Sequence, residues 1–279
     1  MCENAVNARV PVAVPGARGS SPLLKKVAGA VAATAALGAA TAAYGHFIEL
    51  NNFQLRTESL PVLPAGSPDF RILHISDMHM IPGQQKKIDF MHSLAALEPD
   101  LVMNTGDNLS HVDGMGPLLE ALDPLMDFPG VFVPGSNCYF APVFKNPARY
   151  LWQPRTPQMI EEGSRVALPI ERMHEAFESR GWTGLVNRYD TLNLKGLRLE
   201  FSGVDDPHLR YDEHPGFAPG AFDEGQEPSV RIGVAHAPYM RTLHRFVQDG
   251  AQAIFAGHTH GGQVCLPGGH ALVSNCDLP

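Results

Sequence analysis

Short apolar runs alternate with segments of helical spacing over most of the chain. The apolar runs are rich in Ile, Leu and Val and are short enough to be buried strands. They cover residues 70–76, 100–104, 130–133, 230–235 and 251–256. The segments between them place apolar residues three or four positions apart, as amphipathic helices do. These segments are 88–97, 118–126, 171–180 and 239–248. The alternation predicts βαβ units and a mostly parallel sheet.

Turn-rich segments separate some of these elements. Lys195-Gly196 lies between the apolar stretches 191–194 and 197–202, which predicts a β-hairpin. Two further short runs, 264–265 and 271–274, predict closing strands. The loop 141–168 is long and rich in proline, so we expect it to be an insertion near the functional site.

An uncharged run rich in alanine, residues 27–45, lies near the N-terminus after four basic residues. Its length is close to the about 20 residues that a membrane-spanning helix needs. It is a signal anchor, with the basic end in the cytoplasm and the remaining chain outside, or a cleaved signal peptide of a secreted protein, or a soluble helix. The first interpretation predicts a cell-membrane protein whose large C-terminal domain lies outside the cytoplasm.

The chain therefore divides into four predicted parts. They are a basic tail, the apolar segment, a linker with three prolines, and a single large domain. Their residues are 1–26, 27–45, 46–69 and 70–279.

Composition narrows the class of protein. The 279 residues are 44% hydrophobic, which is enough for one domain with a sizeable core. The formal net charge is −8, and the domain has no basic stripe, so we expect no nucleic-acid partner. Four cysteines without a Cys-x-x-Cys pair exclude a zinc ribbon.

Polar clusters follow five of the predicted strands. They are Asp77-Met78-His79, Gly106-Asp107-Asn108, Gly135-Ser136-Asn137, His236 and Gly257-His258-Thr259-His260. Ligands of open α/β sheets bind beyond the carboxyl ends of the strands, so we expect the clusters to converge on one site. Carboxylates with imidazoles and a carboxamide suit Mn, Fe or Zn.

The order of these clusters resembles the calcineurin-like metallophosphoesterase family. The family pattern is Asp-x-His, Gly-Asp, Gly-Asn-His-Asp/Glu, a single His and Gly-His-x-His, and the resemblance covers about residues 70–265. The runs HISDMH, TGDN, PGSN and AGHTHGGQ are most similar to the membrane-associated bacterial phosphoesterases of the family.

This resemblance implies a four-layer α/β/β/α sandwich with two divalent metal ions. Asp77, His79 and His260 would hold the first metal, Asp107 would bridge both, and Asn137, His236 and His258 would hold the second. The metals would activate a bridging hydroxide that attacks the phosphorus of a phosphomonoester, phosphodiester or pyrophosphate. Members of the family usually continue past Pro279, so we expect the domain to be C-terminally incomplete.

One motif departs from the family pattern, because Gly135-Ser136-Asn137-Cys138 stands where Gly-Asn-His-Asp/Glu is usual. Counted from Gly135, Ser136 takes the place of the metal-binding Asn and Asn137 that of the catalytic His. With one extra residue in the loop, Asn137 is the ligand and Cys138 takes the His place. We favour Asn137 as the ligand, since a carboxamide oxygen ligates better than a neutral hydroxyl. Cys138 is then a proton donor, a soft ligand or a buried inert thiol.

The expected activity is thus metal-dependent hydrolysis of a phosphate ester. If the anchor is real, a membrane lipid carrying a phosphate ester is a candidate substrate. The alternative is a non-catalytic metal-binding scaffold on the same fold, because the motif His is missing. Three further histidines lie on polar loops, where we expect them to be solvated: His208, His214 and His270.

Overall fold

A computed structural model of the chain describes residues 21–143, 165–219, 229–262, 264–266, 270–273 and 275–278. The chain splits into two compact units, Met1–Gln54 and Leu55–Pro279. The loop expected near the site, 141–168, lies mostly outside the described residues.

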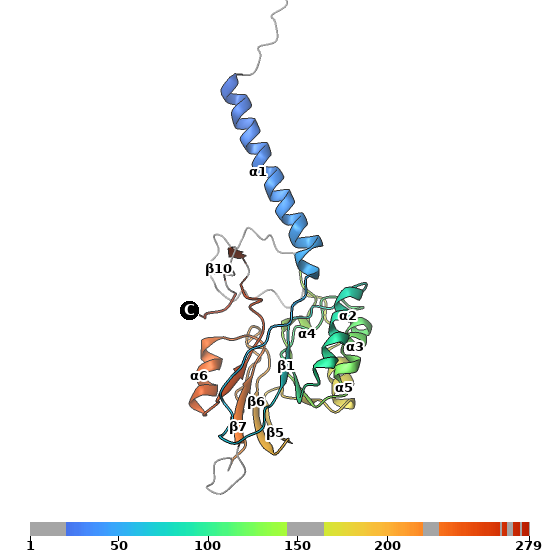
Figure 1. Ribbon diagram of the computed structural model, residues 1–279, viewed down its shortest axis with the longest axis vertical. Coiled ribbons are helices and arrows are strands. Elements are labelled where there is room, and N and C mark those ends of the chain that lie inside the picture. The colour runs from blue at the N-terminus through green and yellow to red at the C-terminus, as the bar shows by residue number, and fades with distance from the viewer. Residues whose placement is uncertain are drawn as a thin grey trace, which may run out of the picture. The chain divides into compact units, whose positions relative to one another are not determined.

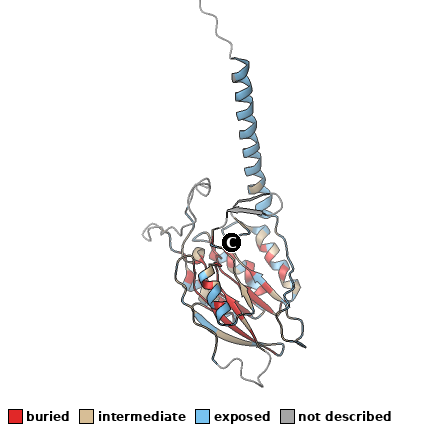
Figure 2. Cartoon of the chain, turned by 90° about the vertical axis from the view of Figure 1, so that its left-hand side faces the viewer, coloured by how far each residue is buried: buried red, intermediate tan, exposed pale blue. Residues whose placement is uncertain are grey.

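The first unit contains one long helix, α1 (Pro22–Phe47), followed by the short 3₁₀ helix η1 (Glu49–Asn51). Figure 2 shows α1 exposed along its length. An 18-residue stretch within Lys25–Asn51 has a mean hydropathy of 1.5 and none of it is buried, so this helix is long and apolar enough for a membrane anchor or a signal sequence. The helix contains the apolar run 27–45 found in the sequence.

The second unit contains a sheet that is parallel throughout, here called sheet 1, with the strand order β1-β2-β3-β4. Its strands are β1 (Ile72–Ile75), β2 (Leu101–Asn104), β3 (Gly130–Phe132) and β4 (Thr183–Gly184). The first three were predicted from their apolar runs. β4 was not, because two residues are too short to give a pattern.

The other large sheet, sheet 2, has the order β5-β6-β7-β8. Its strands are β5 (Arg188–Leu194), β6 (Leu197–Gly203), β7 (Ser229–Val234) and β8 (Ala253–Phe255). β5 and β6 form the predicted hairpin, and Lys195 and Gly196 both have positive φ, as a type I′ turn requires. β6, β7 and β8 are parallel.

Helices cover the outer faces of both sheets (Figure 1). Those packed on sheet 1 are α2 (Gln85–Ser93), α3 (Met115–Leu122) and α5 (Ile170–Ser179), and α6 (Met240–Gln248) packs on sheet 2. Shorter elements are η2 (Leu94–Leu97), η3 (Asp123–Leu125), α4 (Ser136–Tyr139) and the antiparallel pair β9 (Val264–Leu266) and β10 (His270–Val273).

Three apolar clusters lie between the layers. In β2, Val102 packs toward the helices while Leu101 and Met103 pack toward sheet 2, as the two-residue period of a strand requires. Phe246 of α6 is fully buried and forms the third cluster on the outer face of sheet 2. The layers are therefore helix, sheet, sheet and helix, and the predicted α/β/β/α fold is confirmed.

Candidate metal centre

The polar clusters follow strands of both sheets, and the structure brings them together. β1, β2 and β3 end before Asp77, Asp107 and Asn137, while β7 and β8 end before His236 and His258. Since the strands within each set are parallel, their carboxyl ends lie at one edge of each sheet. Side chains from both sheets meet there, because Nε2 of His236 is 3.3 Å from Oδ2 of Asp107.

One group of potential ligands consists of Asp77, His79 and His260. Oδ1 of Asp77 lies 3.2 Å from Nε2 of His260 and 3.9 Å from Nε2 of His79. The two imidazole Nε2 atoms are 3.3 Å apart, and their rings are stacked. This group is partly open to solvent, since His260 is exposed.

A second group consists of Asp107, His236 and His258, all of them buried. Nδ1 of His258 lies 3.2 Å from Nε2 of His236. The carbonyl oxygen of Thr105 is 2.8 Å from Nδ1 of His236, and this contact turns Nε2 of the same ring toward Asp107.

Asp107 lies between the two groups. Its Oδ2 is 3.3 Å from Nε2 of His236 in the second group and 3.8 Å from Nε2 of His79 in the first. Asp77 also approaches the second group, since its Oδ1 is 4.0 Å from Nε2 of His236. Asp107 is thus placed as a carboxylate shared by two sites would be.

The backbone turns sharply at these residues. Five potential ligands have left-handed backbone angles, which residues other than glycine rarely adopt. They are Asp77 (φ 54), His79 (φ 45), Asp107 (φ 51), His258 (φ 68) and His260 (φ 52). The backbone strain of such left-handed residues concentrates at functional sites, where the surrounding structure holds it in place.

Close backbone packing keeps the turns in position. A Cβ at Gly106 would lie 2.5 Å from the backbone nitrogen of Gly135, and a Cβ at Gly257 would lie 2.5 Å from Oδ2 of Asp77. The backbone N–H of His258 donates to that same oxygen of Asp77, at 2.9 Å. Only glycine lets these loops approach so closely.

The two groups fit divalent cations. Oδ1 of Asp77 is buried and makes no hydrogen bond to the described residues, although three imidazole nitrogens lie within 4.0 Å of it. Such an atom is costly to bury unless a further partner satisfies it. Carboxylate oxygens and imidazole nitrogens are the donors that Mn, Fe and Zn take.

The electrostatics of the site keep both carboxylates ionised. Burial would raise the pKa of the Asp77 carboxyl, but the imidazoles of His260 and His236 outweigh this effect and hold the pKa below its usual range. The same balance, with His236 and His79 as partners, lowers the pKa of Asp107. Burial and the neighbouring His236 lower the pKa of His258 to about 3, so its ring is neutral and able to ligate. Burial would lower the pKa of His236, but the carboxylate of Asp107 outweighs this effect and raises the pKa to about 10, so a cation that binds there must displace a proton from this ring.

Comparison with known proteins decides the family. The family model described as calcineurin-like phosphoesterase matches residues 70–262, which is more than half of the chain. The chain belongs to the calcineurin-like phosphoesterase family. It is 27% identical over 215 residues to a protein of Bacillus subtilis (strain 168) described as uncharacterized protein YpbG, a match that covers 75% of this chain and 69% of that protein. Among solved structures, it matches TT1561 of Thermus thermophilus with a TM-score of 0.38 and 13% identity, over 67% of this chain and 81% of that one.

Asn137 lies close to residues of both ligand groups. Its carboxamide nitrogen lies 3.2 Å from Nδ1 of His79 in the first group. Its backbone N–H donates to Oδ1 of Asp107 at 2.7 Å. These contacts can orient Asp107 and His79, and the role of Asn137 as a metal ligand stays a prediction. Ser136, the alternative ligand, begins α4, and its role stays a prediction.

The burial of Cys138 argues against a role as proton donor or soft ligand. Its thiol is fully buried in the core beneath sheet 1, where it accepts the backbone N–H of Asn108. Burial raises its pKa to about 12, so the thiol keeps its proton. Of the three interpretations, burial supports the inert thiol, and the role of Cys138 stays a prediction.

The sequence analysis missed a cluster after β6. His208, expected to be solvated, is partly buried, with its ring centroid 4.7 Å from that of His258. Asp206, two residues earlier, is fully buried. Asp206-Pro207-His208 repeats the Asp-x-His pattern of Asp77-Met78-His79 at the end of a strand, and this repetition was the signal that could have found it. His214 was also expected to be solvated but pairs with Asp249 at 2.7 Å, and the side chain of His270 lies outside the described residues.

Proposed function

We propose that this protein hydrolyses phosphate esters with two divalent cations bound at the candidate metal centre. The observation that supports this most directly is the position of Asp107 between two groups of ligands, within 3.8 Å of an imidazole nitrogen of each. Membership of the calcineurin-like phosphoesterase family supports the same class of reaction.

In this proposal, the two ligand groups have separate tasks. Asp77, His79 and His260 would hold one cation, and His236 with His258 would hold the other, while Asp107 contacts both. When bound, two divalent cations polarise the phosphoryl oxygens and lower the pKa of a water molecule. The open first group, with exposed His260, gives the substrate its access.

The chain's own residues orient these ligands. The carbonyl of Thr105 fixes the ring of His236, and the N–H groups of Asn137 and His258 hold the carboxylates of Asp107 and Asp77. Such hydrogen bonds fix ligands before a cation arrives and raise affinity.

The loop that contains Asn137 also affects which leaving groups the substrate can have. On either alignment the family's histidine is missing from Gly135-Ser136-Asn137-Cys138, and neither the carboxamide of Asn137 nor the buried thiol of Cys138 is suited to give a proton to a leaving group. Protonation of the leaving oxygen therefore falls to water. We expect aryl esters, whose leaving groups are acidic, to react much faster than alkyl esters.

The experiment is turnover of an aryl phosphodiester by the metal-free chain after addition of Mn²⁺. We expect activity that requires Mn²⁺ and that falls by at least about 100-fold in Asp107→Asn, since one charged ligand of both cations is lost. Asp113→Asn is the matched control, because its side chain is 78% exposed and belongs to neither ligand group. Binding of Mn²⁺ to a folded protein without turnover would instead favour the non-catalytic scaffold.

We further propose an amphiphilic phosphate ester, such as a membrane lipid, as the substrate. The support is the length and apolar character of α1. The test compares hydrolysis of esters with and without an alkyl chain by the full chain in detergent. Equal rates for both would remove the support for a lipid substrate.

A further inference from the structure

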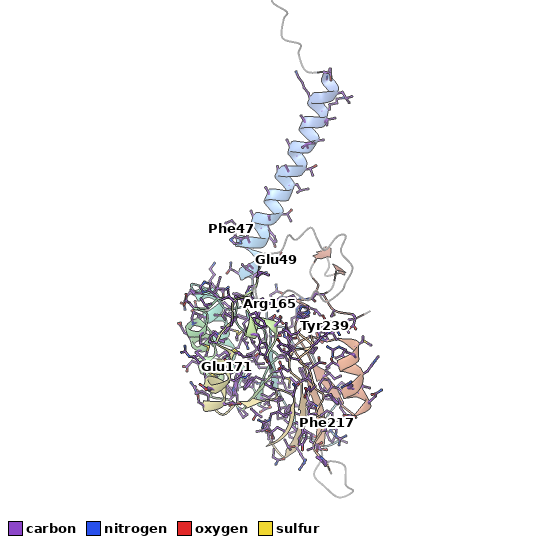
Figure 3. All side chains as sticks on the ribbon, turned by 180° about the vertical axis from the view of Figure 1, so that it is seen from behind. Phe47, Glu49, Arg165, Glu171, Phe217 and Tyr239 are labelled. Atoms are coloured by element: carbon purple, nitrogen blue, oxygen red, sulfur yellow. The ribbon has the colours of Figure 1, made fainter. Side chains whose placement is uncertain are left out.

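An aromatic pair covers the second ligand group from the side of sheet 2. Tyr239, labelled in Figure 3, lies at the start of α6. Its ring centroid is 6.3 Å from that of His208 in a stacked arrangement and 6.4 Å from that of His258. The rings of His208 and His258 are closer still, at 4.7 Å. Both aromatic residues therefore pack against one potential metal ligand.

Three hydrogen bonds hold His208 in this place. The hydroxyl of Tyr239 lies 2.9 Å from Nδ1 of its ring. The buried carboxylate of Asp206 accepts its backbone N–H at 2.9 Å. The guanidinium of Arg241 donates to the carbonyl of Pro207, the preceding residue, at 2.8 Å. Because these hydrogen bonds fix both the backbone and the ring of His208, this ring can hold the neighbouring ring of His258 in place.

His258 needs such a neighbour. Its Nδ1 lies 3.2 Å from Nε2 of His236, on the side of the second group. Its other ring nitrogen, Nε2, is buried and makes no hydrogen bond to any described residue. Histidine ligands are normally oriented by a hydrogen bond from that second nitrogen to a carboxylate, a carbonyl or water. For His258, packing against two anchored rings takes the place of that bond.

We propose that His208 and Tyr239 are positioning residues for His258, and that the affinity of the second cation depends on them. This inference rests on the proposed function, because it assumes that the second ligand group binds a cation. It assigns a role to the second Asp-x-His sequence of the chain, in which Asp206 holds the turn and His208 presents its ring to the ligand.

The test is a calorimetric titration of the metal-free full chain in detergent with Mn²⁺. We expect the wild-type protein to bind two ions. His208→Ala and Tyr239→Phe should weaken the second ion by about 10- to 100-fold and leave the first unchanged, as is usual for residues that orient a ligand. At Mn²⁺ concentrations that load both sites of the wild-type protein, the wild-type protein should give the electron paramagnetic resonance signal of a coupled Mn²⁺ pair. At the same concentrations, the two variants should give the signal of a single ion.

His214→Ala is the matched control, since it removes a histidine of the same loop that pairs with Asp249 instead. It should leave both affinities unchanged. Tyr239→Phe keeps the ring and removes only the hydroxyl, so it provides the test if His208→Ala does not fold.

The outcomes separate the two claims. The wild-type protein and both variants could bind two ions with equal affinity. This result would overturn the positioning role and leave the proposed function standing. An equal loss in His214→Ala would show that loosening the loop is sufficient, which also overturns the role. A wild-type protein that binds no ion would overturn both claims.

Discussion

The backbone of a single glycine, Gly135, lies very close to two potential ligands of the metal centre. Gly135 precedes α4 directly above Asp107 and His236, and a Cβ at this position would lie 2.6 Å from two ring atoms of His236 and closer still to Oδ1 of Asp107. No real Cβ makes such contacts, so one added methyl group must push the shared carboxylate or the imidazole aside.

Gly135→Ala should therefore weaken Mn²⁺ binding and destabilise the domain by about 1–3 kcal/mol, the usual cost of overpacking. Thermal unfolding and Mn²⁺ titration measure the two effects. Gly38→Ala in α1 is the control, because a Cβ there meets nothing within 4 Å. Unchanged Mn²⁺ affinity in Gly135→Ala would contradict the tight packing that we describe.

The sequence predicted which side chains gather at the site but not all of their contacts. Asp107 and His236 follow apolar runs, so their common location follows from parallel strands. The orientation of Asn137 depends on the short helix α4, which has no periodic pattern to reveal it. His208 was missed because its loop is polar and rich in proline, and only the packing of Tyr239 brings it to His258.

At the level of elements, sheet 2 contains a buried charge on its central strands. Glu200 of β6 is fully buried, and its carboxylate accepts hydrogen bonds from Arg198 on the same strand at 3.0 Å and from Arg231 on β7 at 3.2 Å. A buried carboxylate is tolerated only with such partners, and removing one member of the group leaves the others unpaired.

Glu200→Gln should lower the free energy of unfolding by about 3 kcal/mol, because two guanidinium groups lose their counter-charge in a mostly buried place. Chemical denaturation measures this loss. Asp190→Asn is the control, since its pair with Arg188 is exposed and worth about 1 kcal/mol or less. Equal effects of the two substitutions would mean that burial of Glu200 does not matter.

Most elements could be predicted because strands appear as short apolar runs and helices as apolar residues three or four positions apart. The strands of the two inner faces gave apolar runs, and α6 gave a helical stripe that ends at the buried Phe246. Among the described elements of the second unit, β4 and α4 had no such pattern. β4 pairs with β3 over only two residues, and α4 forms one turn whose place is set by the tertiary fold.

For the whole molecule, the two sheets must stay together for the centre to exist. Asp77 and Asp107 come from sheet 1, and His236 and His258 come from sheet 2. The apolar cluster between the sheets, which includes Leu101 and Phe201, therefore also holds the two halves of the site in register.

The long helix α1 makes a separate prediction about location. The full chain should remain in the membrane fraction after a high-salt and carbonate wash and be released by detergent, because α1 offers an apolar span. Residues 55–279, the second compact unit, should stay in the soluble fraction. A full chain found in the soluble fraction would contradict the anchor, and a shortened chain in the medium would indicate a cleaved signal sequence.

The most direct measurement is a crystal structure of the Mn²⁺-loaded protein with anomalous diffraction. We predict two anomalous peaks, one contacted by Asp77, His79 and His260 and one contacted by His236 and His258, with Asp107 touching both. A single peak, no peak, or peaks that Asp107 does not reach would contradict the two-cation centre.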